Sequence, residues 1–198
     1  MELTAEHLSE VFKERTAKDL FFVDALSIVQ NNSSGEIWLI GGFLYRNLVN
    51  GSYGNCEKPA KDFDFIVENA DESIVLPEGW RKALNTFGNP KFIGPSEQEI
   101  DFVPLEKVYS IEKRKIKNPR IEDYLSGAPL NIHSIAYDVQ EHRVIGDAGI
   151  SALERKVVAV HHLEMAQDAA GIYETSVNDM IQKKSEELGF KAELVQEK

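Results

Sequence analysis

Hydrophobic positions recur at helical spacing through the first thirty residues and then switch to the alternation typical of strands. Leu8 and Phe12 lie on one helical stripe, and Thr4 is placed to cap its first turn. Residues 20–29 give a second apolar segment of the same period, followed by a polar turn rich in Asn, Ser and Gly. We therefore predict a helical N-terminal extension over residues 1–35 that packs against a sheet.

The first strand, at 36–40, runs directly into Gly41-Gly42, and the residues after it predict a helix that carries Arg46. Adjacent glycines before a helix let backbone amides approach a phosphate, and the helix N-terminus favours negative charge. Gly41, Gly42 and Arg46 are therefore candidate nucleotide-binding residues, and Lys61, after a polar loop, is a fourth. The alternative is a simple turn that needs a positive φ.

Alternation in the next strand places Asp62 and Asp64 on one face and Phe63 and Phe65 on the other. Neighbouring carboxylates repel each other unless a cation or a proton lies between them. Oxygen ligands of this kind suit Mg²⁺, or Mn²⁺ in its place, without help from His or Cys. The alternative is a solvated edge strand whose charges discourage aggregation.

A third carboxylate comes from the strand over 98–104. Its alternation puts Glu99 and Asp101 on one face, with Ile100 and Phe102 on the other. Beside the first pair of acids, Asp101 would complete a set that bridges two metal ions roughly 3.5–4 Å apart. Glu99 is the alternative ligand on the same face.

Two further motifs follow in order, IHSIAYD at 132–138 and ALERK at 152–156. With LIGGFLYR, KDFD and IDFV before them, they resemble the head domain of class II CCA-adding enzymes and bacterial poly(A) polymerases, in the DNA polymerase β-like nucleotidyltransferase superfamily. The resemblance implies an α+β (mixed α/β) fold with a small central mixed sheet flanked by helices. It also favours Asp101 over Glu99 and implies that Asp62, Asp64 and Asp101 are the catalytic, metal-binding residues.

This resemblance divides a single predicted domain into the extension, a head-like core at 36–160 and a helical C-terminal segment at 161–198. Two departures from the family concern nucleotide binding. Gly127-Ala128-Pro129 replaces an arginine pair and an aspartate, and His133 replaces an asparagine. The helix predicted at 173–190 reads YETSV where the family has its base-selecting E-D-x-x-R motif, and no long RNA-binding body follows. We therefore do not expect a tRNA-tailing enzyme.

The remaining segments give weaker signals. Pro77 predicts a helix over 77–87 with Trp80 and Leu84 on its buried face. Strands are predicted at 131–138 and 142–145. The pair His161-His162 lies in a helical stretch where adjacent side chains diverge, so it is a poor metal site.

Composition fits a compact domain of 198 residues, 42% hydrophobic and 28% charged. A net charge of −11 argues against a general nucleic-acid binder. One cysteine, Cys56, excludes an intrachain disulfide and fits a reducing, cytoplasmic setting. No apolar run approaches the ~20 residues of a membrane span. The basic stretch at 107–120, flanked by Tyr109 and Tyr124, is either a solvated surface or a weak contact for triphosphate or RNA.

These patterns favour a metal-dependent nucleotidyltransferase that transfers NMP from an NTP to a hydroxyl on an RNA 3′ end, a protein or a small molecule. Mg²⁺ or Mn²⁺ would neutralise the triphosphate and activate the hydroxyl. One alternative is a catalytically degenerate module that binds a nucleotide or a partner. Another is a toxin-like NMP transferase that acts on tRNA or protein.

Overall fold

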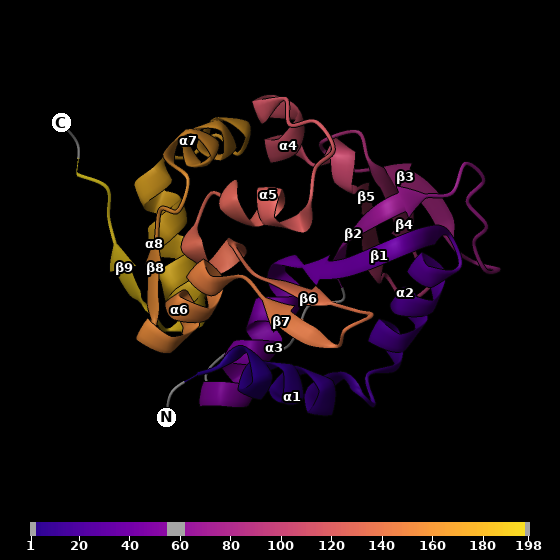
Figure 1. Ribbon diagram of the computed structural model, residues 1–198, viewed down its shortest axis with the longest axis horizontal. Coiled ribbons are helices and arrows are strands. Elements are labelled where there is room, and N and C mark those ends of the chain that lie inside the picture. The colour runs from indigo at the N-terminus through magenta and orange to yellow at the C-terminus, as the bar shows by residue number, and fades with distance from the viewer. Residues whose placement is uncertain (1–2, 55–61, 197–198) are drawn as a thin grey trace.

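A seven-stranded mixed sheet forms the centre of the computed structural model, which describes residues 3–54 and 62–196 (Figure 1). Its strand order is β3-β4-β5-β2-β1-β6-β7, and only the β2–β5 pair is parallel. The strands are β1 (Ser33–Ile40), β2 (Asp62–Ala70), β3 (Arg81–Leu84), β4 (Pro90–Ile93), β5 (Glu99–Pro104), β6 (Ala136–Asp138) and β7 (Arg143–Ile145). The predicted α+β arrangement of a mixed sheet between helices is present. Lys61 and Cys56 lie outside the described residues.

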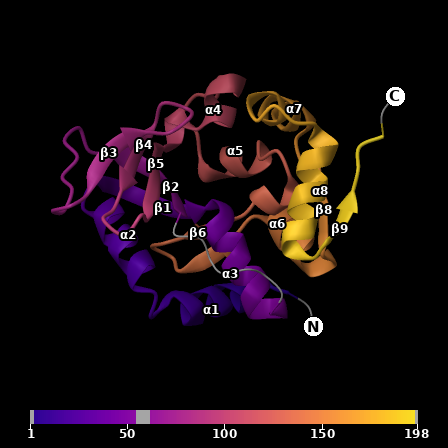
Figure 2. The same cartoon turned by 180° about the vertical axis from the view of Figure 1, so that it is seen from behind.

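Helices cover both faces of the sheet and form the C-terminal part (Figures 1 and 2). They are α1 (Ala5–Thr16), α2 (Leu20–Gln30), α3 (Gly41–Tyr53), α4 (Tyr109–Arg114), α5 (Ile121–Ser126), α6 (Asp147–Arg155), α7 (Leu163–Ile172) and α8 (Val177–Leu188). A short parallel pair, β8 (Val157–Ala159) and β9 (Lys191–Glu193), lies beside α8. The predicted cap of α1 is confirmed, because the His7 N–H donates to Thr4 Oγ1 at 3.2 Å.

The two faces of the sheet have separate cores. On one face, helices α1 to α3 bury a cluster of aromatic rings that includes Phe12, Phe43, Phe63 and Phe65. On the other face, α4 and α5 cover a smaller cluster around Ile66. Side chains alternate along a strand, and Phe63 and Phe65 point into the large core. Asp64, between them on β2, therefore lies on the α4–α5 face.

The helix predicted over 77–87 is wrong. Residues 81–84 form β3, which pairs with β4 through a turn, and Leu84 is 66% exposed. The Asn85 side chain accepts from the Phe87 and Asn89 N–H groups, both at 3.0 Å, and so fixes the turn. Pairing with a neighbouring strand therefore outweighs the helical spacing of two apolar residues.

Other boundaries also differ from the prediction. Strand β1 begins at Ser33, inside the predicted turn, and a register shift lies between Ser34 and Ile37. The single helix predicted at 173–190 is α8 alone, capped by Ser176, and α7 ends before it. The strand predicted at 131–138 is a 3₁₀ turn (Asn131–His133) followed by β6. Within residues 3–54 and 62–196, no helix combines the length and apolar character of a membrane span.

Candidate functional site

Three aspartates lie together on the α4–α5 face of the sheet. Strand β2 pairs in parallel with β5, and this register sets Asp64 beside Asp101 and Asp62 beside Glu99. The intervening Phe63 is buried in the opposite core, so the predicted alternation is confirmed. The two strands therefore bring to one place acids that lie 37 residues apart in the chain, 64 against 101.

The glycine pair at the start of α3 packs directly onto Asp64. Gly41 has φ +73°, and a Cβ built on it would overlap the Asp64 carboxylate. Asp64 accepts a hydrogen bond from the Gly42 N–H. In this arrangement, the first turn of α3 stabilises the Asp64 carboxylate through its amides and its dipole. The role in phosphate binding predicted for Gly41 and Gly42 remains a prediction.

We expect Gly41→Ala to destabilise the protein by about 2 kcal/mol or more, because it combines a strained left-handed backbone with overlap on Asp64. Gly189→Ala is the matched control. Gly189 has φ +66° at the end of α8, and no atom of the described residues lies within 4 Å of its built Cβ. Urea unfolding of both variants would measure the difference. Equal losses would show that Gly41 does not need its close approach to Asp64.

Burial and mutual repulsion disfavour the charged forms of these acids. Burial raises the pKa of Asp64 to about 7, and the charges of Asp62 and Asp101 add to this effect. Burial likewise raises the pKa values of Asp62 and Asp101, against the opposing charge of Lys91. The cluster is therefore electrostatically strained as it stands, and a cation would relieve it.

Lys91, on β4, is the cation that the described structure places among the acids. Its Nζ lies 2.7 Å from Glu99 Oε2 and 3.5 Å from Asp101 Oδ1. Burial would lower the pKa of Lys91, but the Glu99 hydrogen bond and the Asp101 charge outweigh it, and the net shift is upward. Lys91 was not predicted as a site residue, because the sequence pattern did not assign its segment to the sheet. Its antiparallel register with Asp101 was the missing signal.

The carboxylate oxygens of these acids are ligands that Mg²⁺ prefers, but they are not arranged around a single metal position. Among the residues described, no three His, Cys, Asp or Glu side chains are close enough to hold a metal ion together. However, Asp101 Oδ1 is buried, and Lys91 Nζ lies 3.5 Å from it, too far for a good hydrogen bond. The backbones of Asp64 and Asp101 are paired, so their carboxylates lie at neighbouring positions on one face of the sheet.

A cavity of about 380 Å³ opens beside the acids. Gly41, Gly42, Asp64 and Asp101 line its sheet side. Its opposite wall is apolar and aromatic, and is formed by Tyr109, Tyr124, Met165, Ala169, Ile172, Tyr173 and Met180. The site is therefore a slot with carboxylates at one side and mainly hydrophobic side chains from α4, α5, α7 and α8 around the rest.

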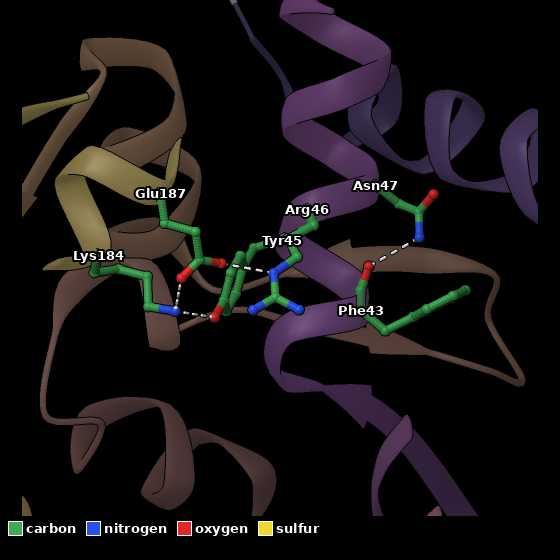
Figure 3. A network of polar contacts seen from close by, with 6 residues as sticks. All are labelled: Phe43, Tyr45, Arg46, Asn47, Lys184 and Glu187. Carbon is green, nitrogen blue, oxygen red and sulfur yellow. Dashed lines mark hydrogen bonds and ion pairs between the residues drawn. The ribbon is translucent and has the colours of Figure 1, made fainter. Parts of the chain in front are cut away.

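Arg46, predicted to bind nucleotide, is held by an acid from the C-terminal part. Its Nε donates to Glu187 Oε1 at 2.6 Å, and Lys184 Nζ lies 2.6 Å from Glu187 Oε2 and 2.7 Å from the Tyr45 hydroxyl (Figure 3). Lys184 and Arg46 lower the pKa of Glu187 against the effect of its burial. This network ties α3 to α8, which lie side by side in Figure 2. Its role in docking α8 was not predicted, because the partners are 141 positions apart.

His133 also lines the cavity, with its ring centroid 5.9 Å from that of Tyr45. Burial lowers the pKa of His133 to about 4, so its imidazole is neutral at physiological pH. The Tyr124 hydroxyl donates to the His133 carbonyl at 3.1 Å. A neutral imidazole offers one donor and one acceptor to a ligand in this cavity.

Part of the basic stretch at 107–120 contacts other residues of the protein. Lys113 pairs with Asp168 of α7 at 2.9 Å, and Lys107 lies 3.5 Å from Glu112. Arg114 donates to the Ser110 and Asp123 carbonyls and to Ser126, which joins α4 to α5. A role for this stretch in triphosphate or RNA contact remains a prediction. The predicted helical position of the histidine pair is wrong, because His162 only caps α7 and His161 precedes it.

Comparison with known proteins gives a match in fold. No family model matches the sequence, and no curated protein sequence does so either. A CCA-adding enzyme solved with CTP superposes on 98% of this chain and 44% of its own length, with a TM-score of 0.63 and 18% identity. A CCA-adding enzyme in an apo form superposes on 95% of this chain and 43% of its own length, with a TM-score of 0.61 and 20% identity. The Thermotoga maritima CCA-adding enzyme complexed with tRNA superposes on 95% of this chain and 42% of its own length, with a TM-score of 0.62 and 18% identity.

The chain spans less than half the length of each of these enzymes. At this identity the match establishes the fold alone. The predicted nucleotidyltransferase fold, resembling the head domain of CCA-adding enzymes, is therefore confirmed.

Proposed function

We propose that this nucleotidyltransferase-fold protein transfers NMP from a nucleoside triphosphate to a hydroxyl acceptor, in a reaction that depends on Mg²⁺ or Mn²⁺. The observation that carries the proposal is the register of β2 and β5, which places Asp64 beside Asp101 at the N-terminus of α3. Asp62, Asp64 and Asp101 would hold the metal. When bound, it supplies charge neutralisation of the phosphates and a lower pKa for the acceptor hydroxyl.

The residues of the chain position the reactants. The slot beside Asp64 and Asp101 encloses the triphosphate and its base, and its apolar wall excludes water, which strengthens the electrostatic interactions inside. The acceptor oxygen bonds to the α-phosphorus, and the bond from that phosphorus to the bridging oxygen breaks. Pyrophosphate leaves with the electron pair, and the hydroxyl proton passes to water. Catalysis of this kind consists of positioning and electrostatics.

The direct test is incubation of the protein with Mg²⁺ or Mn²⁺ and each α-labelled NTP, with and without total RNA. Pyrophosphate release together with label in an acceptor is the expected result. Absence of both with every NTP would contradict the proposal. Total RNA, a lysate protein fraction and a small-molecule fraction, tested separately, would identify the acceptor, including the toxin-like alternative.

A second candidate, a module that binds nucleotide without turnover, is favoured by Lys91. This ammonium already neutralises part of the acid cluster, where a catalytic site would hold a metal. For such a module, NTP binding would persist without pyrophosphate release. Lys91→Met would then weaken NTP binding, whereas in the transferase it would leave metal-dependent binding in place.

Base discrimination is expected to be poor. The wall of the slot opposite the acids carries apolar side chains such as Met165, Ile172 and Met180, and none of the described residues that line the slot is an arginine that could pair with an acid to read a base edge. Large discrimination requires polar groups that the wrong base leaves unsatisfied. Competition among ATP, CTP, GTP and UTP should therefore give affinities within about tenfold of one another. A thousandfold preference would indicate that another group, such as His133, reads the base.

A further inference from the structure

Lys91, Asp101 and Asp64 lie in a row across three neighbouring strands. In the strand order β4-β5-β2, Asp101 of β5 is paired with Lys91 on one side and with Asp64 on the other. Residues directly opposite each other on neighbouring strands project from the same face of a sheet. The Asp101 carboxylate therefore has an ammonium on its β4 side and a carboxylate on its β2 side.

The β3–β4 hairpin engages Asp101 through two side chains. Lys91 Nζ lies 3.5 Å from Asp101 Oδ1 and 2.7 Å from Glu99 Oε2, and the Asn85 side chain, from the turn of the hairpin, hydrogen-bonds to Asp101. The Lys91 and Asp101 side chains are only 21% and 20% exposed, so their charges are screened less than surface charges are. Asp101 is thus held on the side away from Asp64, whereas the proposed metal position lies between Asp101 and the acids of β2.

The charge of Lys91 acts on the whole acid cluster. Burial raises the pKa values of Asp62, Asp64 and Asp101, and the charge of Lys91 opposes that rise at each of them. An ammonium and a divalent cation relieve the same repulsion among carboxylates, and at short range they repel each other. The presence of one therefore weakens the binding of the other.

We propose that Lys91 is an internal competitor of the divalent cation, which neutralises the acids of the free protein and has to leave Asp101 before that carboxylate binds metal. The inference rests on the proposed metal-dependent reaction and assigns a control of its metal site. Lys91 keeps the metal-free protein stable, and it sets the metal concentration at which the acids are filled.

The test measures Mn²⁺ binding to the full chain without nucleotide, near neutral pH, from the electron paramagnetic resonance signal of free Mn²⁺. We expect Lys91→Met to tighten Mn²⁺ binding about tenfold or more, and Lys91→Arg to stay within about threefold of wild type. Lys91→Gln keeps a hydrogen-bond donor for Glu99 without the charge, and it should behave as Lys91→Met does. It replaces Lys91→Met if that variant does not fold.

Lys82→Met is the matched control. Lys82 is an exposed lysine on the adjoining strand β3 and is paired with Phe92 in place of an acid. This variant removes the same charge from the protein, and it should keep Mn²⁺ affinity within about threefold of wild type. A gain equal to that of Lys91→Met would show that net charge, and not competition at Asp101, sets the affinity, and would overturn the inference.

Urea unfolding separates competition from a purely structural role. In EDTA, Lys91→Met should be less stable than wild type, because the buried carboxylates lose their compensating charge. Saturating Mn²⁺ should then stabilise Lys91→Met more than it stabilises wild type. Lower stability with unchanged Mn²⁺ affinity would show that Lys91 only supports the fold. Weaker Mn²⁺ binding would show that it supports the metal ligands, and either result overturns the competition.

These measurements require no transfer reaction, so the inference and the proposed function can fail separately. If wild type transfers NMP and Lys91→Met binds Mn²⁺ no more tightly, the competition is overturned and the proposed function stands. If no NTP is turned over but Lys91→Met binds Mn²⁺ more tightly, the proposed function is overturned and the competition stands. Failure of wild type and of every variant to bind Mn²⁺ would overturn both.

Discussion

Asp64→Asn is expected to reduce NMP transfer by at least about a thousandfold, on the order of 4 kcal/mol in the barrier. Asp64 is the acid that the first turn of α3 holds beside Asp101, so its loss removes a proposed metal ligand at the centre of the cluster. Asp62→Asn should have a similar effect. Transfer within about tenfold of wild type in either variant would contradict the metal assignment.

The same substitution should stabilise the metal-free protein at neutral and alkaline pH. The folded pKa of Asp64 is about 7, against an ordinary value near 3.8, so between these values the folded state binds more protons than the unfolded state. Stability due to this group is therefore lost as pH rises from about 4 to 7. Asp64→Asn removes that loss, and we expect the gain in the free energy of unfolding over wild type to be about 4 kcal/mol larger at pH 8 than at pH 4. Urea unfolding at both pH values gives the comparison, and it also shows whether the inactive variant is folded.

Asp101→Asn is expected to abolish transfer while NTP binding in the presence of Mg²⁺ stays within about threefold of wild type. Asp101 lines both the slot and a smaller cavity of about 230 Å³, whereas Asp64 lines the slot but not the smaller cavity. Its loss should therefore affect the activation of the acceptor more than the binding of the triphosphate. Calorimetric titration with NTP and the label-transfer assay measure the two effects separately.

Glu99→Gln is the matched control on the same strand and face. Glu99 lies one pleat from Asp101, opposite Asp62, and it forms the shorter of the two contacts with Lys91. We expect this variant to keep transfer within about tenfold of wild type. An inactive Glu99→Gln with an active Asp101→Asn would move the third metal ligand to Glu99.

The local chemistry of the site could be predicted from the sequence because it depends on short-range periodicity. Alternation over 62–65 and 99–102 assigned the carboxylates to one face and the phenylalanines and Ile100 to the other, and the structure agrees. The strand–Gly-Gly–helix order likewise predicted the junction at Gly41. These features survive folding because the side-chain period of a strand is fixed by its backbone.

The surroundings of those acids were decided by tertiary structure. The helix predicted at 77–87 is a hairpin, because pairing with β4 and β5 stabilises an extended backbone that local spacing does not reveal. Because this segment is a hairpin and not a helix, Lys91 lies beside the acids and Phe87 lines the site. The sequence predicts that Arg46 binds nucleotide, but in the structure Arg46 forms an ion pair with Glu187 of α8.

The sequence by itself thus determined which face of each strand carries the carboxylates and where Gly41 joins strand to helix, since each motif is encoded within a few positions. Only the tertiary structure decided what those residues face: a lysine from β4, an apolar wall from α7 and α8, and an aromatic rim from the β3–β4 turn. The physical reason is that contacts between distant segments are selected by burial and pairing energies of the whole chain. Local periodicity fixes the direction of a side chain but carries no information about its distant partner.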